Sequence, residues 1–425
     1  MKTKNPFIFL ISIILILSFP LSSFAGKILI PMDFHQTNHL KAYGVAYWIL
    51  QRAQNVEWLL NYRGGSFMTE AGESIQNHCR LQGVYFELVS PTQAGGIYQN
   101  IEQSNMEVAL LEKAPEIAIY TPSHKEPWDD AVTLALTYAE IPYTTLWDEQ
   151  VLTGELEKYD WLHLHHEDFT GQYGKFYAAY RNALWYKQEQ TISENMARKL
   201  GYKKVSDEKK VVAQAIKDYV ARGGFLFAMC SATETMDIAL AAKGVDIVPQ
   251  ELDGDPVDPG CQEKLDYSKC LAFIDFKVNT NALQYEHSNI DTTPDKLSFV
   301  ANPQADFFTL FEFSAKLDPV PTMLVQNHVN AVNGFMGQNT GFKKDLVKKH
   351  VIILGETVGQ NEVKYLHGNF GRGTFTFFGG HDPEDYQHRV GDPPTDLSLH
   401  KNSPGYRLIL NNILFPAAKK KERKT

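Results

Sequence analysis

The chain alternates between short, continuously apolar runs and longer amphipathic segments. Residues 225–229 (FLFAM) are all apolar, which is typical of a buried strand. Before them, residues 208–222 place apolar side chains on one face at helical spacing, and the pair Gly223-Gly224 separates the two elements. Apolar positions at helical spacing resume after residue 232. Residues 208–240 therefore predict a helix, a buried strand and a second helix in succession.

Similar pairs of elements occur before and after this stretch. Runs 364–368 and 374–378 flank Gly371–Gly373, which predicts an antiparallel pair of strands. Strands that alternate with helices favour the α/β class, with a doubly wound, mostly parallel, flavodoxin-like sheet. The other expected strands are 27–33, 56–61, one that ends before Pro91, 116–120, 143–147, 159–165 and 351–355, and the other expected helices begin near residues 35, 74, 129 and 405.

The same pattern divides the chain into segments. Between residues 249 and 349 the periodicity breaks down and Asn, Asp and Pro become frequent, so we expect an irregular insertion or subdomain that faces the substrate. The full division is a leader (1–25), an N-terminal α/β unit (26–112), the first part of the core (113–248), the insertion (249–349), the completion of the core (350–416) and a basic tail (417–425).

The first 25 residues have the pattern of a secretory signal peptide. Lys2 and Lys4 precede a mostly aliphatic run, and Ser23-Phe24-Ala25 is a small-x-small cleavage site. We expect cleavage after Ala25 and export, either to the periplasm or as a secreted protein. The apolar run is short for a bilayer span and ends at Pro20, so no stable membrane span is expected after cleavage.

Charge and cysteine content narrow the possible partners. The formal net charge of −9 gives no basic surface for nucleic acid, so a small-molecule substrate is expected and the oligomeric state is left open. In an oxidising compartment, Cys261 and Cys270 are expected to pair, because they flank a short loop-rich stretch. Cys79 is interpreted as a buried apolar residue. Cys230 then remains as a free thiol that needs an explanation.

Cys230 is the candidate nucleophile. It follows the strand at 225–229 and precedes a helix, which is the arrangement of a nucleophile elbow. His381 also follows an apolar strand, and the carboxyl ends of parallel strands meet at one sheet edge. An imidazole can take the thiol proton, and a carboxylate orients it. The candidate carboxylates are Asp382, Glu384 and Glu167. The alternative interpretation is a buried core thiol and a histidine at a strand end.

A second cluster of polar residues lies at positions 163–168 (HLHHED). On a strand, His163 and His165 share one face. Together with Glu167 and His388 they predict a possible divalent-metal site, because histidine and carboxylate ligands suit zinc and harder metals. The spacing of these residues matches no zinc signature. The alternative interpretation is that they form the polar lining of a cleft without a metal ion. We expect that the protein needs no cofactor for its activity.

The stretch from about Glu116 through GGFLFAMCSATE to GRGTFTFFGGHDPE resembles the class I glutamine amidotransferase-like superfamily, with the trehalose-utilisation (ThuA-like) branch most similar. The resemblance implies Cys230 at the nucleophile position and His381 at the base position. The chain departs from the family pattern at two places. Ala228 and Ala232 replace the usual elbow glycines, and Pro383 stands where the acid usually lies.

The mature chain, with ILIPMD, NHLKAYG and HLHHEDFTGQYGKFY, also resembles an exported bacterial family often labelled asparagine synthetase B. Such a synthetase needs an N-terminal cysteine and an ATP loop, whereas the mature end is Gly26 and RGGSF is not that loop, so ATP-dependent asparagine synthesis is not expected. The resemblance implies an exported amidotransferase- or hydrolase-like protein that acts on an amide or related bond. The alternatives are a ThuA-like carbohydrate- or metal-binding protein without cysteine catalysis, and a structural envelope protein with a relict site.

Overall fold

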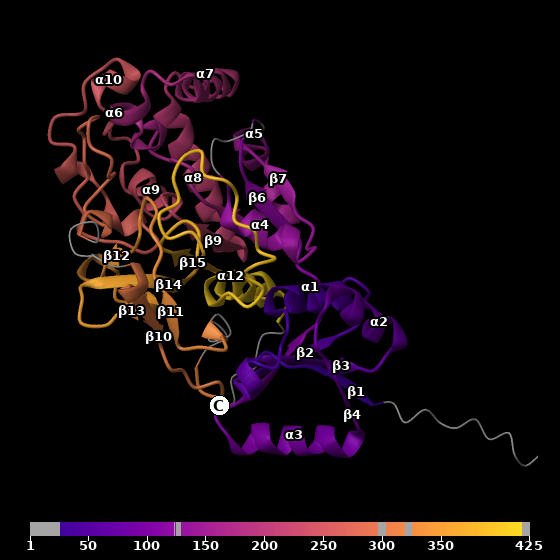
Figure 1. Ribbon diagram of the computed structural model, residues 1–425. Helices are drawn as coiled ribbons and strands as arrows, with labels where there is room; N and C mark the ends of the chain where they lie inside the picture. The colour runs from indigo at the N-terminus through magenta and orange to yellow at the C-terminus, as the bar shows by residue number, and fades with distance from the viewer. Residues whose placement is uncertain (1–25, 123, 125–128, 296–302, 319–324, 419–425) are drawn as a thin grey trace, which may run out of the picture.

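The computed structural model describes residues 26–122, 124, 129–295, 303–318 and 325–418. The predicted signal peptide and most of the basic tail lie outside these residues. The protein is of mixed α/β class and is built on two sheets, a five-stranded N-terminal sheet and a larger mixed sheet (Figure 1). Within the described ranges, no helix has the length and apolar character needed to span a bilayer.

The N-terminal sheet is antiparallel throughout. Its strands lie in the order β4 (Glu87–Val89), β1 (Lys27–Ile30), β3 (Ser66–Glu70), β2 (Val56–Leu60) and β5 (Glu107–Leu111). Helices α1 (His39–Leu50) and α2 (Glu73–Gln82) cover one face, and α3 (Pro91–Gln103) covers the other. The strands and helices expected in this part of the chain are present, and β3, α3 and β5 are additional to them.

The larger sheet joins a parallel half to an antiparallel half. The parallel strands lie in the order β7 (Thr144–Leu146), β6 (Ile117–Tyr120), β8 (Trp161–Leu164), β9 (Phe225–Met229) and β15 (Gly373–Phe378). The antiparallel strands are β14 (Glu362–Phe370), β13 (Ile352–Thr357), β10 (Phe307–Leu310) and β11 (Ala331–Asn333), and β12 (Phe342–Lys343) pairs with β14. The expected antiparallel pair is confirmed as β14 and β15. The sheet as a whole is mixed, because the insertion adds strands that continue from this hairpin.

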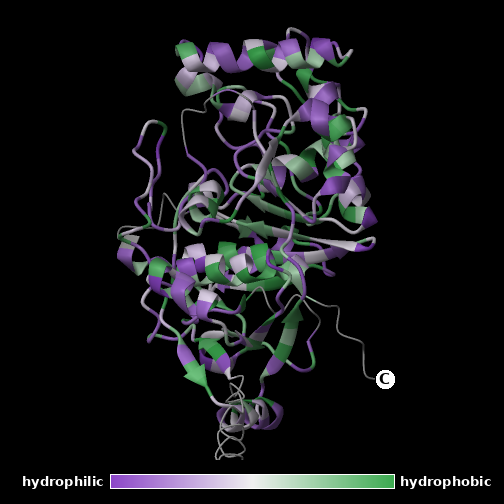
Figure 2. Ribbon diagram, turned by 90° about the vertical axis from the view of Figure 1, so that its right-hand side faces the viewer, coloured by the Kyte–Doolittle hydropathy of each residue, from purple (hydrophilic) through white to green (hydrophobic). Residues whose placement is uncertain are grey.

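Helices cover both faces of the parallel half. Successive strand residues point to opposite faces, so Ile119 and Phe227 pack toward α4 (Ala131–Tyr138) and α12 (Pro404–Leu414). Tyr120 and Leu226 pack toward α8 (Val205–Arg222) and α9 (Ala232–Ala241). Hydrophobic residues gather along these central strands and inner helix faces (Figure 2). The remaining α-helices include α5 (Asp148–Leu152), α6 (Tyr177–Tyr180), α7 (Leu184–Lys199) and α10 (Gln250–Asp253).

The four cysteines are free and buried, so the predicted pairing of Cys261 with Cys270 is wrong. The Cys270 thiol instead donates to the Asp237 carbonyl oxygen of α9 at 3.3 Å. The Asp237 carboxylate accepts hydrogen bonds from the backbone N–H groups of the three residues after Cys270, residues 271–273. The loop around Cys270 is thus fastened to the helix that follows Cys230 by hydrogen bonds rather than by a disulfide.

A buried ion pair fastens α8 to α5, and breaking it is expected to be costly. Lys209 Nζ lies 2.6 Å from Asp148 Oδ2, and both side chains are almost completely buried. Lys209→Met would leave the Asp148 charge uncompensated, so the free energy of unfolding should fall by about 3–5 kcal/mol. Lys199→Met removes the exposed pair with Glu149 and should cost less than about 1 kcal/mol. Urea denaturation followed by circular dichroism measures both, and equal losses would contradict this account.

Candidate functional site

The Cys230 backbone has the shape of a nucleophile elbow. Cys230 follows β9, has a φ of 48°, and is followed after one residue by α9. A non-glycine residue in this left-handed region is strained, and such strain clusters at functional sites. The Ala232 N–H donates to the His165 carbonyl oxygen at 3.0 Å, which ties the start of α9 to the end of β8. The sharp turn therefore holds Cys230 at the carboxyl edge of the parallel strands.

The backbone N–H groups of Ser231 and Gln338 lie beside the Cys230 sulfur, and both favour its thiolate form. Gln338 belongs to the insertion, and its side-chain amide donates to the Gly174 carbonyl oxygen at 2.7 Å. The insertion thus places a backbone N–H group beside Cys230 through a well-anchored residue. A pair of fixed N–H groups beside a nucleophile is the arrangement of an oxyanion hole.

Two histidines lie beside Cys230. The Cys230 sulfur and one ring nitrogen each of His165 and His381 are all within 4.8 Å of one another. His165 Nε2 and His381 Nδ1 are 2.9 Å apart, which is a hydrogen-bond distance. The predicted pair of Cys230 and His381 is therefore brought together, and His165 joins it as an additional imidazole.

Asp130 is the carboxylate that supports this pair, and the sequence analysis did not identify it. Its Oδ1 atom lies 3.1 Å from His165 Nδ1 and 3.2 Å from His163 Nε2. Burial opposes ionisation of Asp130, but the two imidazoles hold the pKa of this carboxyl well below its ordinary value. If His165 donates from Nδ1 to Asp130, its Nε2 accepts from His381 Nδ1. His381 Nε2 then carries the lone pair of a base.

The carboxylates predicted to orient His381 are bonded elsewhere. Asp382 accepts the Thr395 hydroxyl at 2.7 Å, and Glu384 pairs with His400 at 2.9 Å. Neither Asp382 nor Glu384 bonds to the His381 ring. Glu167 accepts the backbone N–H of His165 at 2.7 Å, so it positions the end of β8. The orienting acid comes from the start of α4 and not from the residues next to His381.

Burial sets the resting charges of the thiol and its base. Burial raises the pKa of the Cys230 thiol to about 12, against the two backbone N–H groups that favour the thiolate. Burial, and then the neighbouring imidazoles, lowers the pKa of His381 well below its ordinary value. The resting site is therefore a neutral thiol beside a neutral imidazole, and not a thiolate–imidazolium pair.

This charge state predicts slow, steeply pH-dependent alkylation of Cys230. With a pKa of about 12, the thiolate fraction at pH 8 is roughly 10⁻⁴, so iodoacetamide labelling should be at least about 10³-fold slower than for an ordinary thiol. In chelator-treated protein, peptide mass mapping should show a rate still rising at pH 10. Cys230→Ser identifies the labelled peptide. A plateau below pH 8 would mean that the thiolate already exists at rest.

The predicted metal ligands do not form a single set. His163 and His165 face Asp130, whereas His388 lies with His381 and Asp129. His388 Nε2 is 2.9 Å from Asp129 Oδ1, and its Nδ1 is 3.0 Å from Asp385. Asp129 and Asp130 precede α4, at the same sheet edge as Cys230. Asp129 and Asp130 could have been identified from the sequence, because adjacent carboxylates between the end of a parallel strand and the next helix lie at the sheet edge where sites form.

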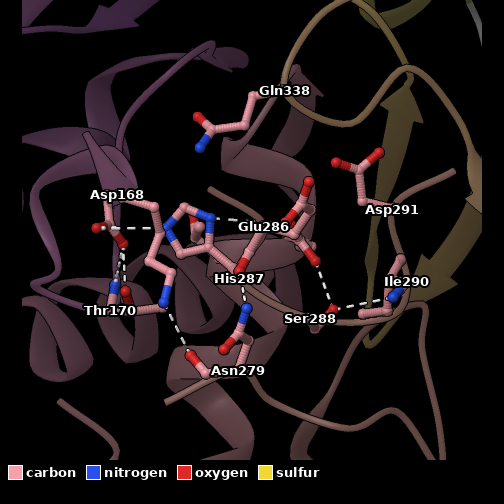
Figure 3. A network of polar contacts seen from close by, with 12 residues as sticks. Asp168, Thr170, Asn279, Glu286, His287, Ser288, Ile290, Asp291 and Gln338 are labelled. Carbon is pink, nitrogen blue, oxygen red and sulfur yellow. Dashed lines mark hydrogen bonds and ion pairs between the residues drawn. The ribbon is translucent and has the colours of Figure 1, made fainter. Parts of the chain in front are cut away.

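A second buried polar network ties the insertion to α9. His287 lies 3.4 Å from Asp168 Oδ2 (Figure 3). It also lies 3.8 Å from Glu234 Oε1. Ser288 donates its hydroxyl to Glu234 at 2.5 Å and accepts the Ile290 N–H. Burial, and then the nearby Asp291, raises the pKa of Glu234 well above its ordinary value, which favours the neutral carboxyl group. The network thus ties the insertion to α9, the helix that follows Cys230.

A cavity of about 50 Å³ is lined in part by residues that follow His165, among them His166 and Glu167, but Cys230, His165 and His381 are not part of its wall. It has room for a few water molecules and is much smaller than a pocket for a drug-sized ligand. Cys230 and His381 are only 3% and 6% exposed. The group that reaches the thiol must therefore be small. The cavity wall includes Trp147, His166, Glu167, Tyr173, Trp185 and Lys209.

The sequence matches no known protein family, and no curated protein matches it. Among solved structures, cytoplasmic protein STM1381 from Salmonella typhimurium LT2 is 12% identical, with 72% of this chain and 100% of that chain covered and a TM-score of 0.37. STM3548 from Salmonella typhimurium has the same identity and coverage and a TM-score of 0.33. A β-galactosidase from Bacillus circulans sp. alkalophilus is 9% identical over 63% of this chain and 29% of its own, with a TM-score of 0.24. These scores are below 0.5, so the likenesses carry no argument about function.

Proposed function

We propose that the protein is an exported hydrolase or amidotransferase-like enzyme that cleaves a small amide or related acyl bond with Cys230 as nucleophile. The observation that carries the proposal is the convergence of three features on one sulfur atom. These are the strained elbow at Cys230, the two N–H donors of Ser231 and Gln338, and the supported imidazole pair. A core cysteine needs none of these features.

The proposed reaction begins from the neutral pair. His381 Nε2 takes the Cys230 proton as the sulfur bonds to the carbonyl carbon of the substrate. We expect the Ser231 and Gln338 N–H groups beside the sulfur to donate to the oxyanion that forms. His381 then returns the proton to the leaving nitrogen or oxygen as the bond to the carbonyl carbon breaks. Water cleaves the resulting thioester by the same route, releasing the acid and restoring the thiol.

The Asp130–His165–His381 chain supports this proton transfer. The positive charge that forms on His381 is shared with His165 through their 2.9 Å contact, and Asp130 stabilises it with a negative charge. His163 also bonds Asp130 and the Phe227 carbonyl oxygen, so it holds the carboxylate in place. His381 is thus the base, and His165 and Asp130 are positioning residues.

We further propose that the parallel half of the larger sheet is a doubly wound, flavodoxin-like core. Taken in chain order, its strands have the spatial order 2-1-3-4-5, with helices on both faces. In such sheets, sites form beyond the carboxyl ends of the strands, which is where Cys230 lies. The resemblance of the sequence motifs to the class I glutamine amidotransferase-like superfamily implies the same core and the same nucleophile position, although no family model matches the chain.

A substrate screen tests the proposal. The mature protein is incubated with glutamine, small amides and small activated esters, and release of ammonia, amine or alcohol is measured. We expect turnover of at least one small acyl substrate and none of bulky analogues, because the thiol is buried. Cys261→Ser, remote from the imidazole pair, should retain this turnover. Turnover only of bulky substrates, or of none, would count against the assignment.

A further inference from the structure

A second set of ligand-type side chains shares His381 with the thiol site. One atom each of Asp129, His381 and His388 lies within 4.8 Å of the others. Asp129 precedes α4, whereas the two histidines belong to the segment after β15, where their rings stack with centroids 4.5 Å apart. Two imidazoles and one carboxylate are a common donor set for zinc and other divalent transition metals.

The polar atoms of this set lack hydrogen bonds. Asp129 Oδ1, His381 Nε2 and His388 Nε2 are buried, and none has a hydrogen-bond partner in the described part of the chain. Asp129 Oδ1 and His388 Nε2 are 2.9 Å apart, an ion-pair distance without hydrogen-bond alignment. Buried polar atoms are nearly always satisfied. A proton on His388 Nε2 would interact only with Asp129 Oδ1. A bound cation would interact with all three unpartnered atoms.

The outer hydrogen bonds of the two imidazoles fit metal ligation. His388 Nδ1 is 3.0 Å from Asp385 Oδ2, and His381 Nδ1 is 2.9 Å from His165 Nε2. Both Nδ1 atoms are therefore engaged, and both Nε2 atoms are left for the set. Metal-bound histidines commonly use their second nitrogen in this way, often toward a carboxylate.

The two neighbouring sets are at least partly satisfied within the protein. Asp130 Oδ1 forms a hydrogen bond with His163 Nε2 at 3.2 Å, whereas His165 Nδ1 lies 3.1 Å from it without a hydrogen bond. In the set with Cys230, His165 Nε2 and His381 Nδ1 bond each other at 2.9 Å. The Asp129 set differs because each of its three residues directs toward the others a buried atom that is unpartnered among the described residues.

We propose that Asp129, His381 and His388 bind one divalent transition-metal ion, zinc by donor type, beside the Cys230 thiol. Three protein ligands leave a coordination position for water. The ion takes the His381 Nε2 lone pair that the proposed thiol chemistry uses, so metal loading switches that chemistry off. This regulatory role rests on the proposed function, whereas the binding site itself does not.

Cobalt titration of the chelator-treated mature protein, without substrate, tests the site. We expect one equivalent of Co²⁺ with visible d–d bands and no thiolate-to-cobalt charge-transfer band. Zn²⁺ should displace it. Asp129→Asn and His388→Ala should lose stoichiometric binding, and Asp385→Asn should bind about 10–100-fold more weakly. Glu384→Gln, whose carboxyl pairs with His400, is the matched control and should bind as the wild type does.

Three results would overturn the site. These are no stoichiometric binding by the wild type, wild-type binding by both folded ligand variants, or a charge-transfer band that Cys230→Ser removes. Melting temperatures measured without metal show whether the variants are folded. Cys230→Ser should keep one equivalent of metal with an unchanged spectrum. Failure of the thiol chemistry therefore leaves this result intact, and failure of metal binding leaves the thiol chemistry intact.

Discussion

Cys230→Ala is expected to lower kcat/KM by at least about 10³-fold on whichever acyl substrate the wild type turns over. The sulfur forms the bond to the substrate, so no other group replaces it. The two N–H groups and the imidazole pair remain, and they leave a small residual rate. Initial rates of the metal-free variant and wild type, measured at equal concentration, give the ratio.

The stability of this variant separates chemistry from folding. Cys230 has a φ of 48°, and alanine adopts this region no more easily than cysteine, so the strain is unchanged. We expect a melting temperature within a few degrees of the wild type. A folded Cys230→Ala protein with full turnover would exclude the nucleophile role.

Asp130→Asn is expected to lower kcat by about 10²–10⁴-fold while the fold is retained. Asparagine has the same shape but carries no charge to stabilise the imidazolium that forms on the His165–His381 pair. It also offers an N–H₂ group where His163 and His165 find an acceptor, which disturbs the tautomers of both rings.

The choice of asparagine controls for a structural role of Asp130. Asp130 caps α4 by accepting the Val132 N–H at 2.7 Å, and asparagine is an equally good cap. Glu384→Gln tests the acid expected from the sequence and should keep kcat near the wild-type value. A loss in Glu384→Gln without one in Asp130→Asn would reverse the assignment of the orienting acid.

Strands β6 and β9 of the parallel half were predictable because their apolar runs are continuous. The run at 225–229 matches β9, and the expected pair at 364–368 and 374–378 lies within the β14–β15 hairpin. Helix α7 was missed because most of its side chains are polar and only a few are buried. In the antiparallel half, β13 and β14 lie where strands were expected, whereas β10, β11 and β12 in the insertion were not located because such short strands carry little periodicity.

Only the part of the candidate site that follows from the order of the strands could be predicted from the sequence. Cys230 and His381 follow adjacent strands, β9 and β15, so their proximity follows from the topology. The acid was assigned from sequence neighbours of His381, but Gly380 turns the chain there with a φ of 94°. Asp382 consequently bonds Thr395, whereas Asp130 arrives from a loop about 250 residues earlier. Sequence distance carries no information about such a contact.

Trapping of the acyl-enzyme tests the central claim most directly. Metal-free protein is mixed with a small activated ester, quenched in acid within the first turnover and digested for peptide mass mapping. The account predicts one acyl group, on Cys230, in the wild type, with slower acylation at the same residue in Asp130→Asn. Acyl transfer to another residue, or turnover with Cys230 never acylated, would contradict it.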